Sequence, residues 1–405
     1  MGFLSGFTDL AWPLVIAVAW VAGELGHRWM LPRISVYCAV GFLFGGAQLG
    51  VLPAGDDNVG MMLANIGFGL ILFEFGYRIN MKWLRTNAWL GATAILEAGL
   101  TFAAVYVLAR FWGAAVLTSL LLASLSMATS PAALMRVVNE QRSSGQVTER
   151  VLHLAAVNCL LSVFAFKVVL GFWSFDTSGS IVQAVSNSVL ALVIAAALGA
   201  AFGIAVPGLL RMTGRLSEDA TMAFAIAVVL LVGITHTFKI SPLVAGLTFG
   251  LVARHRRVTL NQAQRNFGAL GDLLAVALFV HVAALVEWPR VVAGAGLALA
   301  VIAARAVAKM LGTTLLARPG GISWHKGALT GLGMMSLSVF AMLLLEDTRY
   351  IGIDLIDALS PLAAATLALD LLAPVLAQLA FRLAGEAHLE QPPAQEAVAA
   401  NRTET

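Results

Sequence analysis

Two short polar segments interrupt long apolar stretches, and they hold the side chains best suited to binding an ion. Thr129-Ser130-Pro131 lies inside one apolar stretch, and Asn158-Cys159 lies inside the next. A proline after two hydroxyl residues breaks a helix, and the carbonyls it frees are tolerated at membrane depth only where they line a cavity. A polar pair on the following helix can face the same cavity. We therefore predict an ion-binding site that includes Thr129, Ser130, Asn158 and Cys159.

The elements that must position these residues are membrane-spanning helices. Of 405 residues, 60% are hydrophobic and 12% are charged, whereas about 25% are charged in an average soluble domain. Apolar stretches long enough to cross a bilayer recur along the whole chain, so the sequence predicts an all-α polytopic membrane protein. About 13 spans are predicted, near residues 9–26, 34–51, 58–77, 86–109, 112–137, 149–173, 181–210, 218–237, 240–253, 267–286, 291–316, 326–345 and 359–382.

The charges in the connections predict how the chain is oriented. Basic residues gather in alternate connections, and acidic residues gather in the others. The positive-inside rule then places the N-terminus outside and the C-terminus in the cytoplasm, in the cytoplasmic (inner) membrane. The net charge of +3 implies no nucleic-acid partner. Residues 1–385 form the predicted transmembrane domain, and residues 386–405 are predicted to be a short disordered cytoplasmic tail.

The order of the spans suggests an internal duplication. If span 7 is a linker, spans 1–6 and 8–13 form two inverted six-helix repeats. The break at Thr129-Ser130-Pro131 in span 5 then has a counterpart in span 12, where Gly331–Ser338 is also small and hydroxyl-rich. Ser336 and Ser338 join the predicted site for this reason. The alternative is that these small residues only allow close helix packing.

Several segments resemble the monovalent cation/proton antiporter superfamily, over about residues 10–385. The resemblance implies a panel for dimer contacts (spans 1–3 and 8–10) and a moving core (spans 4–6 and 11–13). It also implies a homodimer in the lipid bilayer that exchanges Na⁺ or K⁺ for H⁺ by an elevator-type motion, with no cofactor. The segments that carry the resemblance are Leu31–Ile34, Val40–Gly45, Leu70–Tyr77, Ala128–Ala132 with Asn158, Ile240–Gly246 and Gly271–Leu274.

The sequence departs from the family at the centre of the expected site. The family's ion-site helix usually carries Asn-Asp or Asp-Asp, whereas this chain has Asn158-Cys159. A thiol is a soft ligand that suits a hard cation poorly. Asn158 can still supply a carbonyl oxygen, but it cannot exchange a proton. Either another carboxylate acts in place of residue 159, or the proton coupling is altered.

Two carboxylates inside predicted spans are candidates for that role, because a charge at the centre of a span is costly. Asp370 in span 13 mirrors Cys159 in span 6. The alternative is that Asp370 is a structural partner of Arg305 or Lys309. Glu97 lies in the middle of span 4. The alternative is that Glu97 only forms a hydrogen bond that holds helices together.

Three basic residues also lie inside predicted core spans. Arg305 and Lys309 are four residues apart on span 11 and therefore share a face. The family usually places a base on this helix, so the resemblance implies that Lys309 occupies the ion site or holds a carboxylate when the cation is absent. The alternative is that Lys309 extends to the interface. Lys167 either pairs with a core carboxylate or extends to the interface.

A second class of function stays open. The chain could use the antiporter fold without conventional proton coupling, as a channel-like conductor, a uniporter or a carrier of anions or organic solutes. Arg305, Lys309 and Lys167 could neutralise an anion. An enzyme is not predicted, since the sequence has no phosphate-binding glycine motif, no His-Glu-x-x-His and no serine elbow. Cys38 and Cys159 form no metal-binding pattern, so no metal beyond a transported ion is expected.

Overall fold

The computed structural model describes residues 2–29, 31–52, 58–173, 181–212, 220–238, 240–256, 267–337 and 359–388. Within these ranges the chain forms helices and no strand. The helices are α1 (Gly2–Arg28), α2 (Arg33–Phe44), α3 (Asn58–Arg78), α4 (Met81–Thr86), α5 (Ala88–Phe111), α6 (Val116–Ser126), α7 (Pro131–Glu140), α8 (Gln146–Trp173), α9 (Ile181–Met212), α10 (Ala220–Thr237), α11 (Pro242–His255), α13 (Gly268–Ala284), α14 (Trp288–Leu315), α15 (Trp324–Gly333) and α17 (Ser360–Leu383).

The length and apolar character of these helices match a protein that crosses a bilayer many times. Nine stretches of the described residues are long and apolar enough to span a membrane. Helices are the natural spanning structure because they satisfy their own backbone hydrogen bonds where no water is present. The predicted all-α polytopic membrane fold is confirmed.

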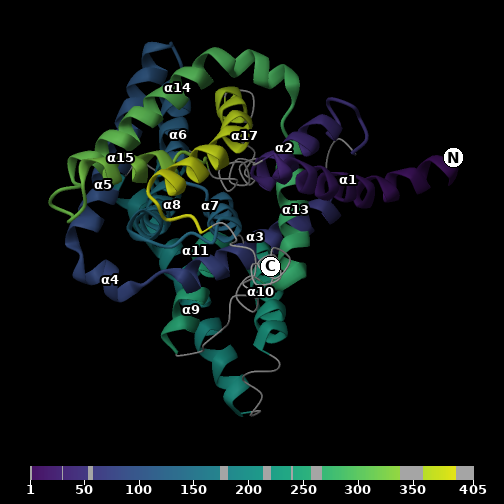
Figure 1. The fold of residues 1–405 in the computed structure, drawn as a ribbon, viewed down its shortest axis with the longest axis horizontal. Coiled ribbons are helices and arrows are strands. Elements are labelled where there is room, and N and C mark those ends of the chain that lie inside the picture. The colour runs from purple at the N-terminus through teal and green to yellow at the C-terminus, as the bar shows by residue number, and fades with distance from the viewer. Residues whose placement is uncertain are drawn as a thin grey trace, which may run out of the picture.

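The helices pack in two groups, which Figure 1 shows on different sides of the molecule. The panel consists of α1, α2, α3, α9, α10, α11 and α13, which are mainly the helices of predicted spans 1–3 and 8–10. The crossing bundle consists of α5, α6, α7, α8, α14, α15 and α17, from predicted spans 4–6 and 11–13. The two groups meet where α2 packs on α17, α3 on α7, and α9 on α8.

The panel is held together by close approaches between helix backbones. A Cβ atom added to Gly76 of α3 would lie 2.0 Å from the carbonyl oxygen of Leu247 on α11, and one added to Gly250 of α11 would lie 2.0 Å from that of Phe73. Only glycine fits at these two positions, which is the usual way that membrane helices come close. The panel is therefore a tightly packed unit.

One boundary and one short helix differ from the prediction. The span predicted at 34–51 is wrong in its second half, because α2 ends at Phe44 before Gly45-Gly46, and glycine commonly ends a helix. The short helix α4 was not predicted; Asn80 begins it by accepting hydrogen bonds from the backbone of its first turn. In the span predicted at 326–345, α15 ends at Gly333, within the expected break at Gly331–Ser338, and residues 338–345 lie outside the described residues.

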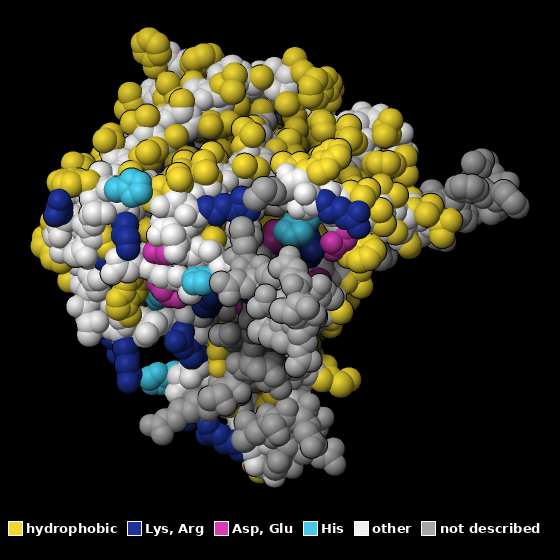
Figure 2. Space-filling model, viewed as in Figure 1, with side chains coloured by type: hydrophobic (Ala, Val, Ile, Leu, Met, Phe, Trp, Pro, Cys, Tyr) yellow, Lys and Arg dark blue, Asp and Glu magenta, His cyan; other side chains and the backbone are white. Residues whose placement is uncertain are grey.

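The basic connections lie together at one end of the molecule, which we call the basic end. On the face shown in Figure 2, apolar side chains cover the upper part and the right side, while Lys, Arg and His side chains lie across the middle and the lower left. Contacts join the helix ends there: His27 Nδ1 to Glu140 Oε1 at 2.8 Å, Arg254 Nη1 to the Arg78 carbonyl at 2.6 Å, the Asn80 amide to His153 Nε2 at 2.9 Å, and Lys326 Nζ to Gln146 Oε1 at 3.1 Å.

The start of the predicted disordered tail is ordered. Glu386 is buried, and its carboxylate accepts hydrogen bonds from the backbone amides of Val147 and Thr148, at 2.9 and 2.8 Å. A carboxylate at a helix N-terminus satisfies free N–H groups and complements the helix dipole. Residues 386–388 of the predicted tail therefore pack against the helices. Residues 389–405 lie outside the described residues.

Candidate functional site

A break between two helices and the non-helical segment after a third helix meet inside the crossing bundle. The first break separates α6 from α7, where Ser130 begins α7 by accepting a hydrogen bond from the Ala133 amide at 3.3 Å. The second break follows α15. Thr129 Oγ1 donates to the Met334 carbonyl at 3.4 Å, and the Ser130 amide donates to the Ser336 carbonyl at 3.3 Å. The two breaks that the sequence placed at mirrored positions thus lie against each other.

Arg305 on α14 binds the backbone carbonyls that these breaks leave free. Its guanidinium donates to the carbonyls of Ser126 at 2.8 Å, Ala128 at 2.6 Å and Ser336 at 3.0 Å, and also to that of Met335. Arginine suits this position because it offers five N–H donors in a fixed plane. The side chain is 1% exposed, so its charge is neutralised by carbonyl dipoles rather than by water.

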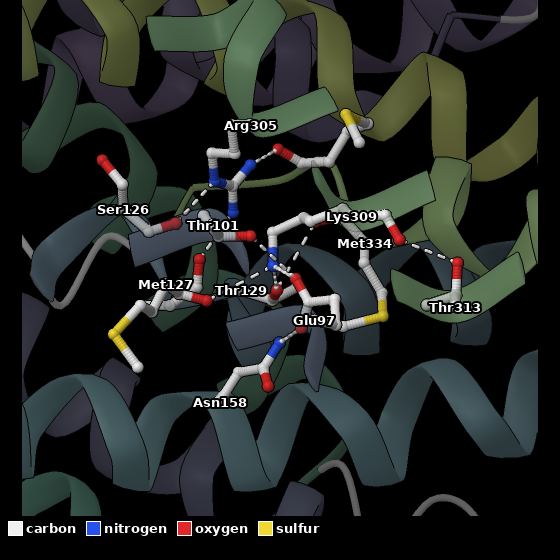
Figure 3. Close-up of polar contacts among 12 residues, drawn as sticks. Glu97, Thr101, Ser126, Met127, Thr129, Asn158, Arg305, Lys309, Thr313 and Met334 are labelled. Carbon is white, nitrogen blue, oxygen red and sulfur yellow. Dashed lines mark hydrogen bonds and ion pairs between the residues drawn. The ribbon is translucent and has the colours of Figure 1, made fainter. Parts of the chain in front are cut away.

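One helical turn further along α14, Lys309 forms an ion pair with Glu97 of α5. Lys309 Nζ lies 2.5 Å from Glu97 Oε1, 3.1 Å from Thr129 Oγ1 and 3.3 Å from the Met127 carbonyl. Both side chains of the pair are fully buried. Figure 3 shows the ammonium group among these oxygen atoms. The site therefore already holds one monovalent cation, the tethered ammonium of Lys309.

Asn158 and Thr101 complete the surroundings of Glu97. Asn158 Nδ2 donates to Glu97 Oε2 at 2.5 Å, and Thr101 Oγ1 donates to Glu97 Oε1 at 3.3 Å (Figure 3). An ionised carboxylate only accepts hydrogen bonds, so the amide nitrogen of Asn158 must face it. This leaves Asn158 Oδ1 buried and without a partner among the described residues. Such an oxygen can take a cation as its ligand.

The family resemblance leads one to expect a carboxylate at position 159, but the Cys159 side chain there makes a structural contact. Its thiol donates to the Thr129 carbonyl at 3.0 Å and is buried. Thr129 is in the break, so Cys159 satisfies a carbonyl freed by the interruption of the helix. The residue supports the geometry of the break.

The structure separates the predicted residues into two sets. It brings Thr129, Ser130, Asn158, Cys159, Ser336, Glu97, Arg305 and Lys309 together around the two breaks. Asp370 of α17 is not the partner of either base, so that alternative is wrong. Lys309 does not extend to the interface, since its side chain is fully buried. Lys167 is half-buried about two turns beyond Cys159 on α8, and Ser338 lies outside the described residues.

Sequence reasoning did not identify Thr101 or the carbonyls of Ser126 and Met127. Thr101 could have been found, because it follows Glu97 by four residues and therefore lies on the same face of α5. The backbone carbonyls carry no side-chain signal.

The site contains one acidic and two basic side chains, Glu97, Arg305 and Lys309. Its formal charge is +1 when all three are ionised. In the described part of the chain, no group of three or more His, Cys, Asp or Glu side chains could hold a metal ion.

Gly312 allows α14 to approach α5 closely enough for this ion pair. A Cβ atom added there would lie 2.6 Å from the Cα atom of Glu97. We expect Gly312→Ala to lower the free energy of unfolding by about 1–3 kcal/mol through overpacking. Thermal unfolding in detergent measures the loss. Gly99→Ala, in open space on α5, is the matched control and should not destabilise; equal stability of the two variants would contradict the close approach.

Comparison with known proteins gives consistent matches. A family model described as sodium/hydrogen exchanger, transmembrane, matches residues 14–378. The ammonium/H⁺ antiporter subunit AmhT of Alkalihalophilus pseudofirmus is 21% identical over 343 residues, which cover 82% of this chain and 84% of the relative. The sodium proton antiporter MjNhaP1 of Methanocaldococcus jannaschii, solved at pH 8, has a TM-score of 0.68 at 17% identity, with 95% of this chain and 100% of that chain covered. An electron-microscopy structure of the same antiporter gives the same TM-score. At this identity the structural likeness shows the fold.

Proposed function

Because the chain belongs to the sodium/hydrogen exchanger family, we propose that it exchanges a monovalent cation for protons across the cytoplasmic membrane. The family and the fold are those of transporters rather than enzymes. The observation that carries the proposal is the fully buried pair of Glu97 and Lys309, in which three oxygen atoms surround one positive charge.

The ammonium group of Lys309 marks the place where the transported cation binds. Na⁺ and K⁺ are hard cations that prefer oxygen ligands, and the oxygens of Glu97, Thr129 and Met127 converge there. The unpartnered Oδ1 of Asn158 supplies a further ligand once Lys309 moves away. A second positive charge beside Lys309 would be costly in a buried site. Lys309 therefore gives up its proton as the cation binds, and the two compete for Glu97.

Movement of the crossing bundle along the panel, an elevator-type motion, would carry the site between the two sides. The last turns of α7 bind the panel at the basic end. Arg136 pairs with Asp272 of α13, and Asn139 Nδ2 donates to Glu74 Oε1 of α3 at 2.7 Å. Glu140 pairs with His27 at the end of α1. These contacts must break when the bundle slides. The positive-inside rule makes the basic end cytoplasmic, with the N-terminus outside.

The panel is the surface that we assign to a homodimer contact, because it stays fixed while the crossing bundle moves. The cation, the proton and the bilayer are the other partners. The tight glycine contacts between α3 and α11 support this assignment, since a fixed scaffold must be rigid.

An anion carrier is less well supported by the same contacts. Each nitrogen of the Arg305 guanidinium donates to a backbone carbonyl, and Lys309 donates to three oxygens. Both bases are engaged in this arrangement, so neither presents a free donor to an anion.

Ammonium should be among the cations tested. A relative is named as an ammonium/H⁺ antiporter subunit, and the oxygens of the site already bind the ammonium group of Lys309.

The proposal is tested by reconstituting the protein in liposomes with a pH gradient and a pH-sensitive dye. Na⁺, K⁺, Li⁺ and NH₄⁺ are added separately, with protein-free liposomes as the control, since free ammonia crosses bilayers alone. We expect at least one cation to dissipate the gradient faster than in the control. If none does so over a working pH range, cation/proton antiport is wrong, and a carrier or conductor without proton coupling becomes the better account.

A further inference from the structure

A cavity at the basic end lies between the panel and the crossing bundle, apart from the site around Glu97. Its volume is about 120 Å³. The panel contributes Glu74 and Arg78 of α3, and the bundle contributes the end of α7 and the residues after it, which are Val138, Asn139, Arg142, Ser143 and Ser144. A drug-sized ligand occupies about 300 Å³ or more, so this cavity suits a group as small as one phosphate.

The charges that line the cavity favour an anion. Arg78 and Arg142 against Glu74 give a formal charge of +1 when all three are ionised. Glu74 is buried, and its Oε1 accepts a hydrogen bond from Asn139 Nδ2 at 2.7 Å. Arg254 of α11 adds a third positive charge close by, because its Nη1 donates to the Arg78 carbonyl at 2.6 Å. Arginine suits phosphate particularly well, since its N–H groups match the spacing of two oxygens.

The two arginines belong to the two parts that the proposed sliding moves past each other. Arg78 of the panel reaches towards the bundle, where its Nη1 donates to Asn139 Oδ1 of α7 at 3.1 Å. Arg142 follows the end of α7 in the bundle. An anion held between the two guanidinium groups would therefore link the panel to the bundle.

The bundle side of the cavity has two further features of a binding site. Arg142 has a backbone φ of 47°, in the left-handed region that glycine and asparagine adopt most readily. Ser143 is 1% exposed, and its hydroxyl has no hydrogen-bond partner among the described residues. A buried hydroxyl without a partner is costly. An oxyanion in the cavity would accept the hydrogen bond that this hydroxyl can donate.

We propose that the cavity binds a small oxyanion of the phosphate class, and that the bound anion holds the crossing bundle against the panel. The oxygens accept hydrogen bonds from Arg78 on one side and from Arg142 and Ser143 on the other. These hydrogen bonds are lost when the bundle slides, so the anion slows exchange. The anion is either free phosphate or the headgroup of an anionic lipid, which present the same oxygens. The inhibition rests on the proposed antiport, whereas the binding does not.

Binding is measured by thermal unfolding of the full chain in neutral detergent, with tetramethylammonium phosphate against the chloride at equal ionic strength. At a phosphate concentration ten times the Kd, we expect the midpoint to rise by roughly 2 °C. Arg142→Asn should bind at least about tenfold more weakly, because it loses a charged donor. Asparagine tolerates the left-handed backbone at this position, so the variant should fold.

Two variants serve as controls for this measurement. Arg142→Lys keeps the charge and should recover part of the affinity. Arg85→Asn makes the same change at an exposed position near the end of α4, and its midpoint should rise as in the natural protein. Phosphatidylglycerol replaces phosphate in a second series. If the natural protein and Arg142→Asn respond equally to phosphate and equally to phosphatidylglycerol, the site is wrong.

Inhibition is measured in phosphatidylcholine liposomes as uptake of the radioactive cation, because phosphate buffers the pH that a dye reports. Phosphate at ten times the Kd should slow the natural protein about tenfold, since only the anion-free form slides. Arg142→Asn should exchange at the natural rate without phosphate and should not be slowed by it. Liposomes that contain phosphatidylglycerol but no phosphate separate the two sources: slowing there that Arg142→Asn lacks identifies the lipid headgroup.

The two measurements separate failure of this inference from failure of the antiport. Anion binding that leaves the uptake rate of the natural protein unchanged would overturn the inhibition. If the natural protein takes up no cation under any condition, the proposed antiport is wrong. The shift of the unfolding midpoint still decides in that case whether the cavity binds an oxyanion.

Discussion

Replacement of Lys309 by methionine is expected to abolish cation-driven proton movement and to lower the free energy of unfolding by about 3–5 kcal/mol. Methionine has a similar length but no charge, so Glu97 loses its only ion-pair partner among the described residues. Glu97 is fully buried and keeps only the hydrogen bonds from Asn158 and Thr101. Thermal or denaturant unfolding in detergent gives the stability, and the dye assay in liposomes gives the transport.

The double variant Lys309→Met with Glu97→Gln separates the ion pair from general damage. Removal of both charges should restore part of the lost stability but none of the transport, because a neutral pair leaves no uncompensated buried charge. Lys82→Met, on the exposed surface of α4, is the control and should behave as the natural protein. Transport at the natural rate by Lys309→Met would contradict the role of Lys309 as proton carrier.

The second large effect is expected at Arg305, where alanine should lower the free energy of unfolding by at least about 4 kcal/mol and abolish transport. Its guanidinium donates to backbone carbonyls from both helix breaks. Each buried carbonyl left without a donor costs about 1–3 kcal/mol. Arg305→Lys keeps the charge but cannot reach all four carbonyls, so its stability should lie between those of Arg305→Ala and the natural protein. Arg318→Ala, at an exposed position, is the control and should leave the free energy of unfolding almost unchanged. If all three variants unfold like the natural protein, Arg305 does not stabilise the helix breaks.

Much of the fold and the two helix breaks could be predicted from the sequence. Proline after Thr129-Ser130 cannot continue a helix, and mirrored small residues before Ser336 indicated the second break. The break inferences depend on local chemistry that a single helix reveals. Lys309 on α14 was expected near the site for another reason, because the family that the sequence resembles usually places a base on this helix.

The choice between Glu97 and Asp370 could not be made from the sequence. In soluble proteins the polar face of a helix points to water, so the opposite, apolar face is known to be buried. α5 and α17 are apolar all round, since lipid and protein interior favour the same residues. The sequence therefore does not show that Glu97 faces Lys309 while Asp370 faces α2. The sequence also did not show that Glu386 packs against the start of α8. Its partners there lie about 240 residues away along the chain, so no local pattern indicates the contact.

The central claim is that Glu97, on a different helix from residue 159, is the carboxylate for which the transported cation and the protonated Lys309 compete. The most direct test compares Glu97→Gln with Cys159→Ser in the same liposome assay, with the cation that the natural protein exchanges. Glutamine keeps the shape of the side chain and removes the charge, and serine keeps a donor for the Thr129 carbonyl. We predict no cation-driven proton movement for Glu97→Gln and near-natural exchange for Cys159→Ser. Exchange at the natural rate by Glu97→Gln would contradict the account.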